Sequence, residues 1–427
     1  MESRIRRLAD DEVETLIADG APAIAIDGAK GVGKTESARQ FADREFLLDD
    51  PLVAERVRAD PSLLVTQPGA TLIDEWQHLP ESWDLVRRAV DADPGGERRF
   101  LLTGSASRET PTTHTGAGRI ITTRMRPLTL AERGVPWAVG LGDLVHTSAT
   151  SIEGETDLGL PDYVEQITRG GFPGMARLRG RALRGQLDGY LERIVDREVP
   201  EAGLRVRQPD RLRRWLNAYA AATASTASYE AIRGAATPGE GEKLSKPTAQ
   251  VYRDLLERIW VVDPVPAWLG PTAQIMHNLG QAPKHHLVDP ALAARALGVT
   301  SEALLEGATP GFSISQAHKS FLGALFESLV TLNIRVYAQA LECQVRHLRT
   351  HKGAHEVDLI VERPDGRIVA IEVKLAARVG HEDVRHLLWL RDSIGDRLVD
   401  AVVVTTGPYA FRREDGVAVI PAALLGP

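Results

Sequence analysis

The sequence is poor in cysteine and in aromatic residues. Cys343 is the only cysteine in 427 residues, and aromatic residues make up 5% of the chain. A single cysteine excludes an intramolecular disulfide and a cysteine cluster for metal, which fits a reducing cytoplasm. Because aromatic side chains are scarce, the cores must rest on leucine, valine, isoleucine and alanine.

Long apolar runs are also missing. None approaches the roughly 18 residues that a membrane helix needs, and no apolar signal-peptide core follows the basic start of the chain. We therefore expect a soluble, cytoplasmic protein without a membrane partner. A net charge of −7 argues against a general polyanion-binding surface, although a local basic patch can still bind nucleic acid. One such patch, which is equally well a solvated helix face, comprises Arg205, Arg207, Arg211, Arg213 and Arg214.

A complete phosphate-binding loop stands near the start of the chain. The run Ala23-Ile24-Ala25-Ile26 predicts a short buried strand before it, and a helix is expected to begin after it. The glycines let successive N–H groups point at the phosphates of a nucleotide, and the helix N-terminus adds the positive end of its dipole. Lys34 is predicted to reach the β- and γ-phosphates, and the Thr35 hydroxyl to hold Mg²⁺. The predicted nucleotide-binding residues of the loop are Gly28, Ala29, Lys30, Gly31, Val32, Gly33, Lys34 and Thr35.

A second apolar run ends in two carboxylates about 40 residues downstream, as a parallel strand beside the P-loop strand would. Here Asp74 is expected to bind Mg²⁺, and Glu75 to orient or deprotonate the attacking water. A third apolar strand ends at Thr103 and Ser105, where either hydroxyl could sense the γ-phosphate or simply begin a loop. Together these motifs predict a nucleotide hydrolase that uses ATP and Mg²⁺.

Several arginines follow a Ser-, Thr- and Gly-rich loop at residues 104–118. Arg119, Arg124 or Arg126 could stabilise charge in the transition state, and Arg119 is the candidate assigned to nucleotide binding. An ion pair with the acidic surface explains each of them equally well.

The middle of the chain changes to amphipathic helices. Ser245-Lys246-Pro247-Thr248 predicts a capped helix start, and a strand is expected from Trp260. This order is typical of a winged helix, whose exposed face would contact DNA. That face would carry Lys243, Lys246, Thr248, Gln250 and Arg253. A helical lid or a protein-contact module is the open alternative.

A Pro-Asp-Gly turn near Asp365 joins two further strands, expected at 356–362 and 367–374. If the turn centres on Asp365, Asp358 and Glu372 are cross-strand neighbours, and Lys374 lies on the face of Glu372. Two carboxylates and a lysine suit metal-dependent phosphodiester cleavage, with Asp358 and Glu372 as ligands of Mg²⁺ and Lys374 as an aid to catalysis. Glu327, on a preceding helix, is a further candidate ligand. A surface hairpin with ion pairs is the alternative.

These motifs resemble a bacterial and archaeal family of AAA-like P-loop ATPases that carry a C-terminal domain of unknown function related to the PD-(D/E)xK nucleases. Its markers here include the P-loop, Asp74-Glu75-Trp76-Gln77, Gly118-Arg119, Gly170-Gly171-Phe172-Pro173, and Glu356-Val357-Asp358 with Ile371-Glu372-Val373-Lys374. The resemblance implies an α/β fold in three parts. They are a P-loop NTPase with a parallel sheet at residues 1–150, a helical and winged-helix middle at 151–282, and a restriction-endonuclease-like α/β domain at 283–427.

Three functions remain in competition. The first is an ATP-dependent enzyme acting on DNA through its middle and C-terminal domains, with Glu75, Asp358, Glu372 and Lys374 as catalytic residues. The second is a nucleotide-operated regulatory or defence switch that binds a protein or DNA partner without cleavage. The third is an ATP-dependent chaperone or remodelling factor. A homo-oligomer is compatible with each.

Overall fold

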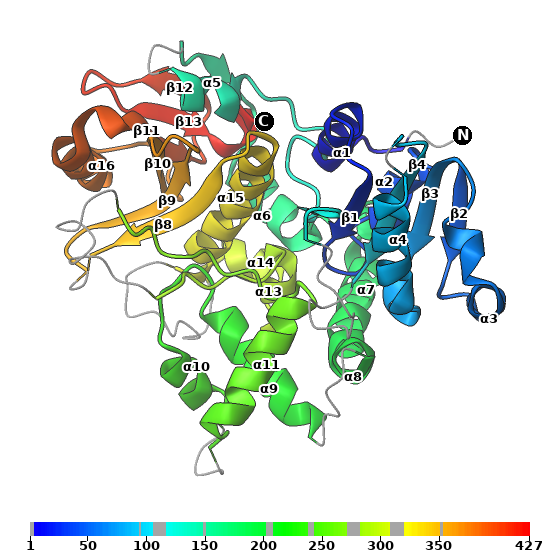
Figure 1. Ribbon diagram of the computed structural model, residues 1–427. Coiled ribbons are helices and arrows are strands. Elements are labelled where there is room, and N and C mark those ends of the chain that lie inside the picture. The colour runs from blue at the N-terminus through cyan, green and yellow to red at the C-terminus, as the bar shows by residue number, and fades with distance from the viewer. Residues whose placement is uncertain are drawn as a thin grey trace.

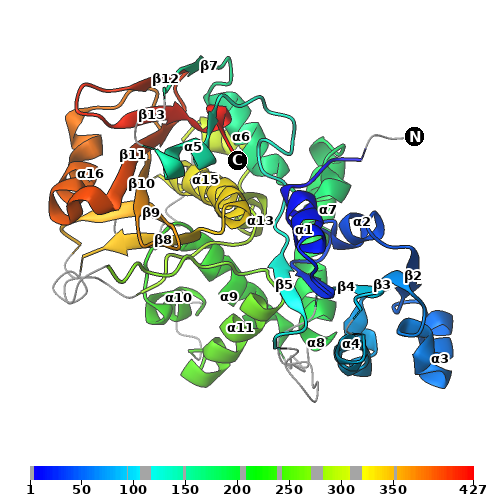
Figure 2. The same cartoon turned by 45° about the horizontal axis from the view of Figure 1, so that its top comes forward.

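The computed structural model describes residues 4–93, 95–105, 117–147, 151–201, 208–237, 243–270, 282–307, 320–350 and 353–427. The N-terminal sheet and the C-terminal sheet lie on opposite sides of the molecule, and the helical middle extends away below them (Figure 1). The long helix α15 (Phe321–Ala340) runs between them, and it contacts α1 (Leu8–Ala18) on one side and strands of the C-terminal sheet on the other (Figure 2).

The N-terminal part is a five-stranded parallel sheet in the order β2-β3-β4-β1-β5. Its strands are β1 (Ala23–Asp27), β2 (Arg44–Leu47), β3 (Gly69–Asp74), β4 (Arg98–Gly104) and β5 (Ile121–Arg124), and its other helices are α2 (Lys34–Arg39), α3 (Pro51–Ala59) and α4 (Glu81–Asp91). Alternate residues of β1 enter different cores, with Ile24 and Ile26 on one face and Ala23 and Ala25 on the other. Apolar residues at successive positions are therefore needed, because both faces of the sheet are covered. The predicted α/β class with a parallel N-terminal sheet is confirmed.

The order of the strands corrects one expectation. We expected the strand that ends in Asp74 to lie beside the P-loop strand, but β4 lies between β3 and β1 and pairs with both. The reason is that adjacency in a parallel sheet depends on how the crossover helices pack, which the two strand sequences do not encode. As a result, the end of β4 with Thr103 stands between the P-loop and Asp74.

A connecting segment joins the first part to the C-terminal sheet. Its β7 (Gly154–Glu155) pairs with β12 (Tyr409–Arg412), and its β6 (Val139–Gly140) pairs with β14 (Leu425–Gly426). Its α5 (Leu141–His146) packs on β10 (Ile368–Val373) and β11 (Leu398–Thr405). Contacts therefore cross the boundary proposed at residue 150, which stays a prediction.

The middle of the chain is helical. Its helices are α6 (Leu160–Arg169), α7 (Gly180–Arg193), α8 (Val199–Glu201), α9 (Pro209–Ala221), α10 (Tyr229–Ala235), α11 (Lys246–Arg258), α13 (Pro290–Ala296) and α14 (Ser301–Leu305). The predicted cap of α11 is confirmed, since the Ser245 hydroxyl accepts a hydrogen bond from the Thr248 N–H. In place of the strand expected from Trp260, isolated antiparallel bridges join Val262 to Leu287 and Val265 to Lys284. These two paired stretches, residues 262–265 and 284–287, are called the short hairpin below. They lie on either side of the boundary proposed at residue 282.

The C-terminal part is a mixed sheet of seven strands in the order β7-β12-β13-β11-β10-β9-β8. Its remaining elements are β8 (Gln344–Arg349), β9 (Glu356–Glu362), β10 (Ile368–Val373), α16 (His381–Ile394), β11 (Leu398–Thr405), β12 (Tyr409–Arg412) and β13 (Ala418–Pro421), with β14 (Leu425–Gly426) in the small sheet with β6. Val369, Ile371 and Val373 enter the main core, as predicted, while Ile368 and Ala370 pack in the cluster that includes residues of α16.

Within the described residues, α15 is long and apolar enough to cross a membrane, by length and composition alone. We expected no such run. However, 78% of its most apolar window is buried inside the protein, as in the core helix of a soluble protein.

Candidate functional site

The P-loop turns between β1 and α2 through close backbone contacts. Gly28 has φ +156°, and a Cβ atom there would lie 2.2 Å from the Met125 carbonyl oxygen. Only glycine fits at that position, because the clash would be with backbone rather than with a mobile side chain. The N-terminal end of α2 then directs its unpaired N–H groups at the loop.

The Lys34 side chain is held over the loop. Its ammonium group donates to the carbonyl oxygens of Gly28 at 2.8 Å and Ala29 at 3.0 Å. Burial lowers the pKa of Lys34, while Glu75, Asp27 and Asp74 act in the opposite direction. A cation enclosed by backbone carbonyls and carboxylates is suited to a polyphosphate, whose charged oxygens are stronger acceptors.

Asp74 lies at the end of β3 between two hydroxyl groups. Thr35 donates to its Oδ1 atom at 2.8 Å, and Thr103 donates to the same oxygen. Burial raises the pKa of Asp74, and these two hydrogen bonds lower it. The hydroxyl and the carboxylate are hard oxygen donors of the kind that Mg²⁺ prefers, so these residues fit the ion that was predicted.

Glu75 follows in a left-handed conformation, with φ 50° and ψ 47°. The Gln77 side chain donates a hydrogen bond to its carboxylate. A non-glycine residue in this region is uncommon and costs free energy, so the surrounding structure must hold it there. Ser105 directly follows β4, on the same edge of the sheet as Glu75.

Other parts of the chain enclose the loop, and the sequence did not identify them. Arg7 donates to the Val32 carbonyl at 2.6 Å, and the Tyr190 hydroxyl donates to the Lys30 carbonyl at 3.0 Å. Phe172 lies against the Tyr190 ring, with the ring centroids 4.8 Å apart. Phe172 belongs to the family marker Gly170-Gly171-Phe172-Pro173, which could have pointed to it. Tyr190 looks like an ordinary core residue of α7.

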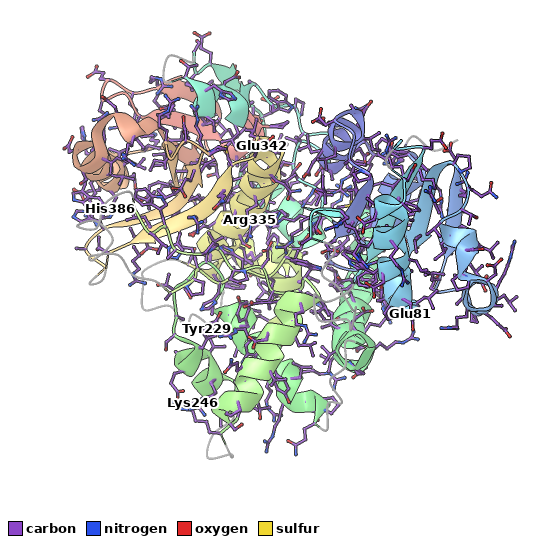
Figure 3. All side chains as sticks on the ribbon, viewed as in Figure 1. Glu81, Tyr229, Lys246, Arg335, Glu342 and His386 are labelled. Carbon is purple, nitrogen blue, oxygen red and sulfur yellow. The ribbon has the colours of Figure 1, made fainter. Side chains whose placement is uncertain are left out.

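The arginine candidates are ion-paired. Arg119 lies 2.9 Å from Asp91 on α4. Arg124 and Arg126 contact Asp263 at 2.9 and 3.0 Å, and Arg335 of α15 contacts it at 2.8 Å. Burial alone would raise the pKa of Asp263, but the three arginines lower it strongly. Arg335 is near the centre of the molecule (Figure 3). Most of the Thr-rich loop, residues 106–116, lies outside the described residues.

Asp263 thus joins three parts of the chain. It stands at the start of the short hairpin after α11, and its partners come from β5 of the first sheet and from α15. β5 leads back to the P-loop, since the Met125 N–H donates to the Asp27 carbonyl at 2.7 Å.

The C-terminal constellation has the predicted register. Ile371 pairs with Leu359, which sets Glu372 opposite Asp358, and both carboxylates are buried. Lys374 lies 2.9 Å from Glu372. The second Asp358 oxygen accepts the Val373 N–H at 2.9 Å.

A lysine that was not predicted enters this cluster. The Lys284 ammonium lies 2.8 Å from Glu327 and 3.0 Å from Asp358. In the part of the chain that the structure describes, no three His, Cys, Asp or Glu side chains are arranged to hold a metal ion. One Asp358 oxygen faces the Lys284 ammonium and the other accepts the Val373 N–H, so the predicted divalent metal does not fit this arrangement of Asp358 and Glu372. No signal in the sequence placed Lys284 near them.

The basic face predicted on α11 is partly neutralised. Lys243 pairs with Glu230 at 2.7 Å, and Arg253 pairs with Asp254 and lies over the Tyr229 ring. Lys246 lies at the far end of the helical middle (Figure 3). From the second patch, Arg213 pairs with Asp196 and Asp210, while Arg205 and Arg207 lie outside the described residues.

Three family descriptions match parts of the chain. Residues 20–133 match an AAA domain, residues 160–303 a domain of unknown function (DUF8612), and residues 322–425 another domain of unknown function (DUF4143). A solved structure of a RuvB variant from Thermotoga maritima is similar to 61% of this chain and 87% of its own, with 14% identity and a TM-score of 0.28. No curated protein matches the chain. Together with the P-loop geometry, the AAA match identifies the N-terminal part as an AAA-type ATPase domain.

Proposed function

We propose that the protein is an ATP-operated switch, in which Mg²⁺-dependent hydrolysis at the P-loop changes how the helical middle and the C-terminal part are held. Lys34 and the loop N–H groups bind the phosphates, Thr35 and Asp74 hold the ion, and Glu75 activates water. Thr103 and Ser105 respond to the γ-phosphate. We assign Arg119 no role in catalysis here, because its exposed side chain pairs with Asp91.

The observation that carries the proposal is the ion cluster around Asp263. Arg124 and Arg126 come from the segment that touches the P-loop at Gly28, while Asp263 and Arg335 belong to the other parts of the chain. A single carboxylate that holds three buried arginines permits few arrangements, because its displacement leaves their charges without this partner. Movement of the loop on binding phosphate is therefore passed to the start of the hairpin and to α15.

Among the partners open to such a switch, we propose duplex DNA, bound through Lys243, Lys246 and Arg253. The pocket beside α11, about 270 Å³, combines basic side chains with the aromatic rings of Trp215 and Tyr229. Metal-dependent cleavage by Asp358, Glu372 and Lys374 is the weaker candidate, because the buried Lys284 ammonium lies 3.0 Å from Asp358. A cytoplasmic location remains part of the proposal.

Hydrogen–deuterium exchange tests the switch without a known partner. The Glu75→Gln variant should bind ATP without hydrolysing it. Adding ATP and Mg²⁺ should then change the exchange of the P-loop, of residues 259–268 and of α15. The Lys34→Ala variant is the control, and it should show none of these changes because the phosphate counter-charge is gone. Changes confined to residues 20–133 would contradict a switch.

A further inference from the structure

The C-terminal carboxylate cluster contains its own cation. Lys284 lies on the second arm of the short hairpin, where its N–H donates to the Val265 carbonyl at 2.9 Å and its carbonyl accepts the Val265 N–H at 2.8 Å. These bonds fix the backbone from which the side chain departs. The Lys284 side chain is 0% exposed, so its ammonium group depends on protein partners alone.

The partners come from a helix and a strand. Glu327 of α15 and Asp358 of β9 lie within 3.0 Å of the ammonium, and Glu356 of β9 lies 3.4 Å away. The ammonium donates hydrogen bonds to Glu327 and Asp358, and Glu356 adds an ion pair. These contacts connect the hairpin arm to α15 and to β9.

A divalent ion at the same carboxylates would stand within a few ångströms of the lysine charge. Repulsion between buried like charges at such a distance is strong, since little water is present to screen it. Mg²⁺ also demands near-octahedral oxygen coordination, whereas one Asp358 oxygen faces Lys284 and the other accepts the Val373 N–H.

We propose that Lys284 is the resident cation of this cluster and takes the place of a divalent metal at Asp358. The C-terminal site is then a joint in which one buried lysine connects the hairpin, α15 and β9 by ion pairs, and it binds metal only when Lys284 is removed or withdrawn. This inference does not depend on the chemistry of the P-loop.

Manganese binding to the full chain without nucleotide tests the proposal, with bound ions counted by electron paramagnetic resonance. The wild type and Asp358→Asn should bind the same number of ions. Lys284→Met should gain one ion, and the double variant Lys284→Met with Asp358→Asn should lose it again. Lys243→Met, which removes an exposed lysine paired with Glu230, should gain none.

An ion bound by the wild type and lost in Asp358→Asn would overturn the proposal, whether or not Lys284→Met folds. A folded Lys284→Met that gains no ion would also overturn it. So would a gained ion that persists in the double variant, because the new site would then lie elsewhere.

Discussion

The Glu75 carboxylate is positioned by its neighbour Gln77, and a glycine makes room for that neighbour. A Cβ atom at Gly104 would lie 2.3 Å from Gln77 Oε1. Gly104→Ala should therefore displace the Gln77 side chain and lower kcat much as Gln77→Ala does, by on the order of 10- to 100-fold, because misplacing a catalytic group slows the step it assists. Steady-state ATP turnover measures both losses.

The double variant provides the sharper comparison. Since both changes break one contact, Gln77→Ala with Gly104→Ala should be no slower than either single variant. Gly185→Ala on α7 is the control, because a Cβ atom there meets nothing within 4 Å. Losses that multiply would show that the two residues act separately.

His347 makes the stability of the protein depend on pH. Burial and then the Lys284 charge lower its pKa to about 4. Between about pH 6.5 and 4 the unfolded chain takes up a proton that the folded chain does not, so the free energy of unfolding falls as the pH falls. The slope approaches about 1.4 kcal/mol per pH unit for one such group.

In His347→Gln the side-chain amide can still donate to the Ala282 carbonyl, which His347 Nε2 contacts at 2.9 Å, but it does not titrate. Urea unfolding at several pH values should therefore show a shallower slope in this variant. The remaining slope comes in part from His285, whose pKa burial also lowers to about 4. An unchanged slope would count against the role of His347.

At the level of single residues, the sequence predicted the strand, turn and helix start of the P-loop, but it did not indicate the lysine cluster. Lys34, Thr35 and their glycines are neighbours in the chain, so their geometry is local. Lys284 reaches Asp358 through a hairpin and a distant strand. Nothing in either segment alone encodes that meeting, and a lysine is rarely expected to be buried.

At the level of secondary-structure elements, the proposed binding of duplex DNA is tested at α11. Lys243 is paired with Glu230, but both side chains are nearly half exposed, and such pairs are weak enough to yield to a phosphate. Replacing Lys243, Lys246 and Arg253 together with Glu should weaken duplex binding and make its logarithmic salt dependence shallower by roughly 2 to 3. Fluorescence anisotropy at several salt concentrations measures both.

A matched variant replaces Arg56, Arg88 and Arg397 with Glu, which changes the net charge equally at exposed positions of other elements. It should keep most of the affinity. If the two triple variants weaken binding alike, the effect is one of overall charge and α11 is not the contact.

The strands also show which features of a sheet the local sequence determines and which it does not. The hairpin of β9 and β10 has the expected register because Pro-Asp-Gly determines the turn, and the turn determines the pairing. The order of β1, β4 and β3 was not accessible in this way. A parallel neighbour arrives through a crossover, and its position depends on packing across the whole sheet.

Across the whole molecule, Asp263 should determine whether the parts unfold together. Asp263→Asn keeps the shape but removes the charge opposite Arg124, Arg126 and Arg335. We expect a loss of about 3–5 kcal/mol in stability, as when one partner of a buried ion cluster is removed, and separate calorimetric transitions for the N-terminal sheet and the rest. In the wild type they should coincide.

Asp91→Asn is the matched control, because it removes the partner of Arg119 from an ion pair that is well exposed on both sides. Its effect should stay below about 1 kcal/mol. Equal effects of the two variants would mean that the Asp263 cluster has no special role in holding the parts together.

The pairing of β6 with β14 has a consequence for synthesis on the ribosome. Val139 pairs with Leu425, and Gly154 of β7 pairs with Ala410. During synthesis both segments must therefore wait unpaired until their partner strands have been translated. At 5–20 residues per second, the wait is on the order of 15 to 60 s. During that interval the edge of β7 and the face of α5 are uncovered in the nascent chain, which makes the stretch after the ATPase domain the natural place for a chaperone to bind.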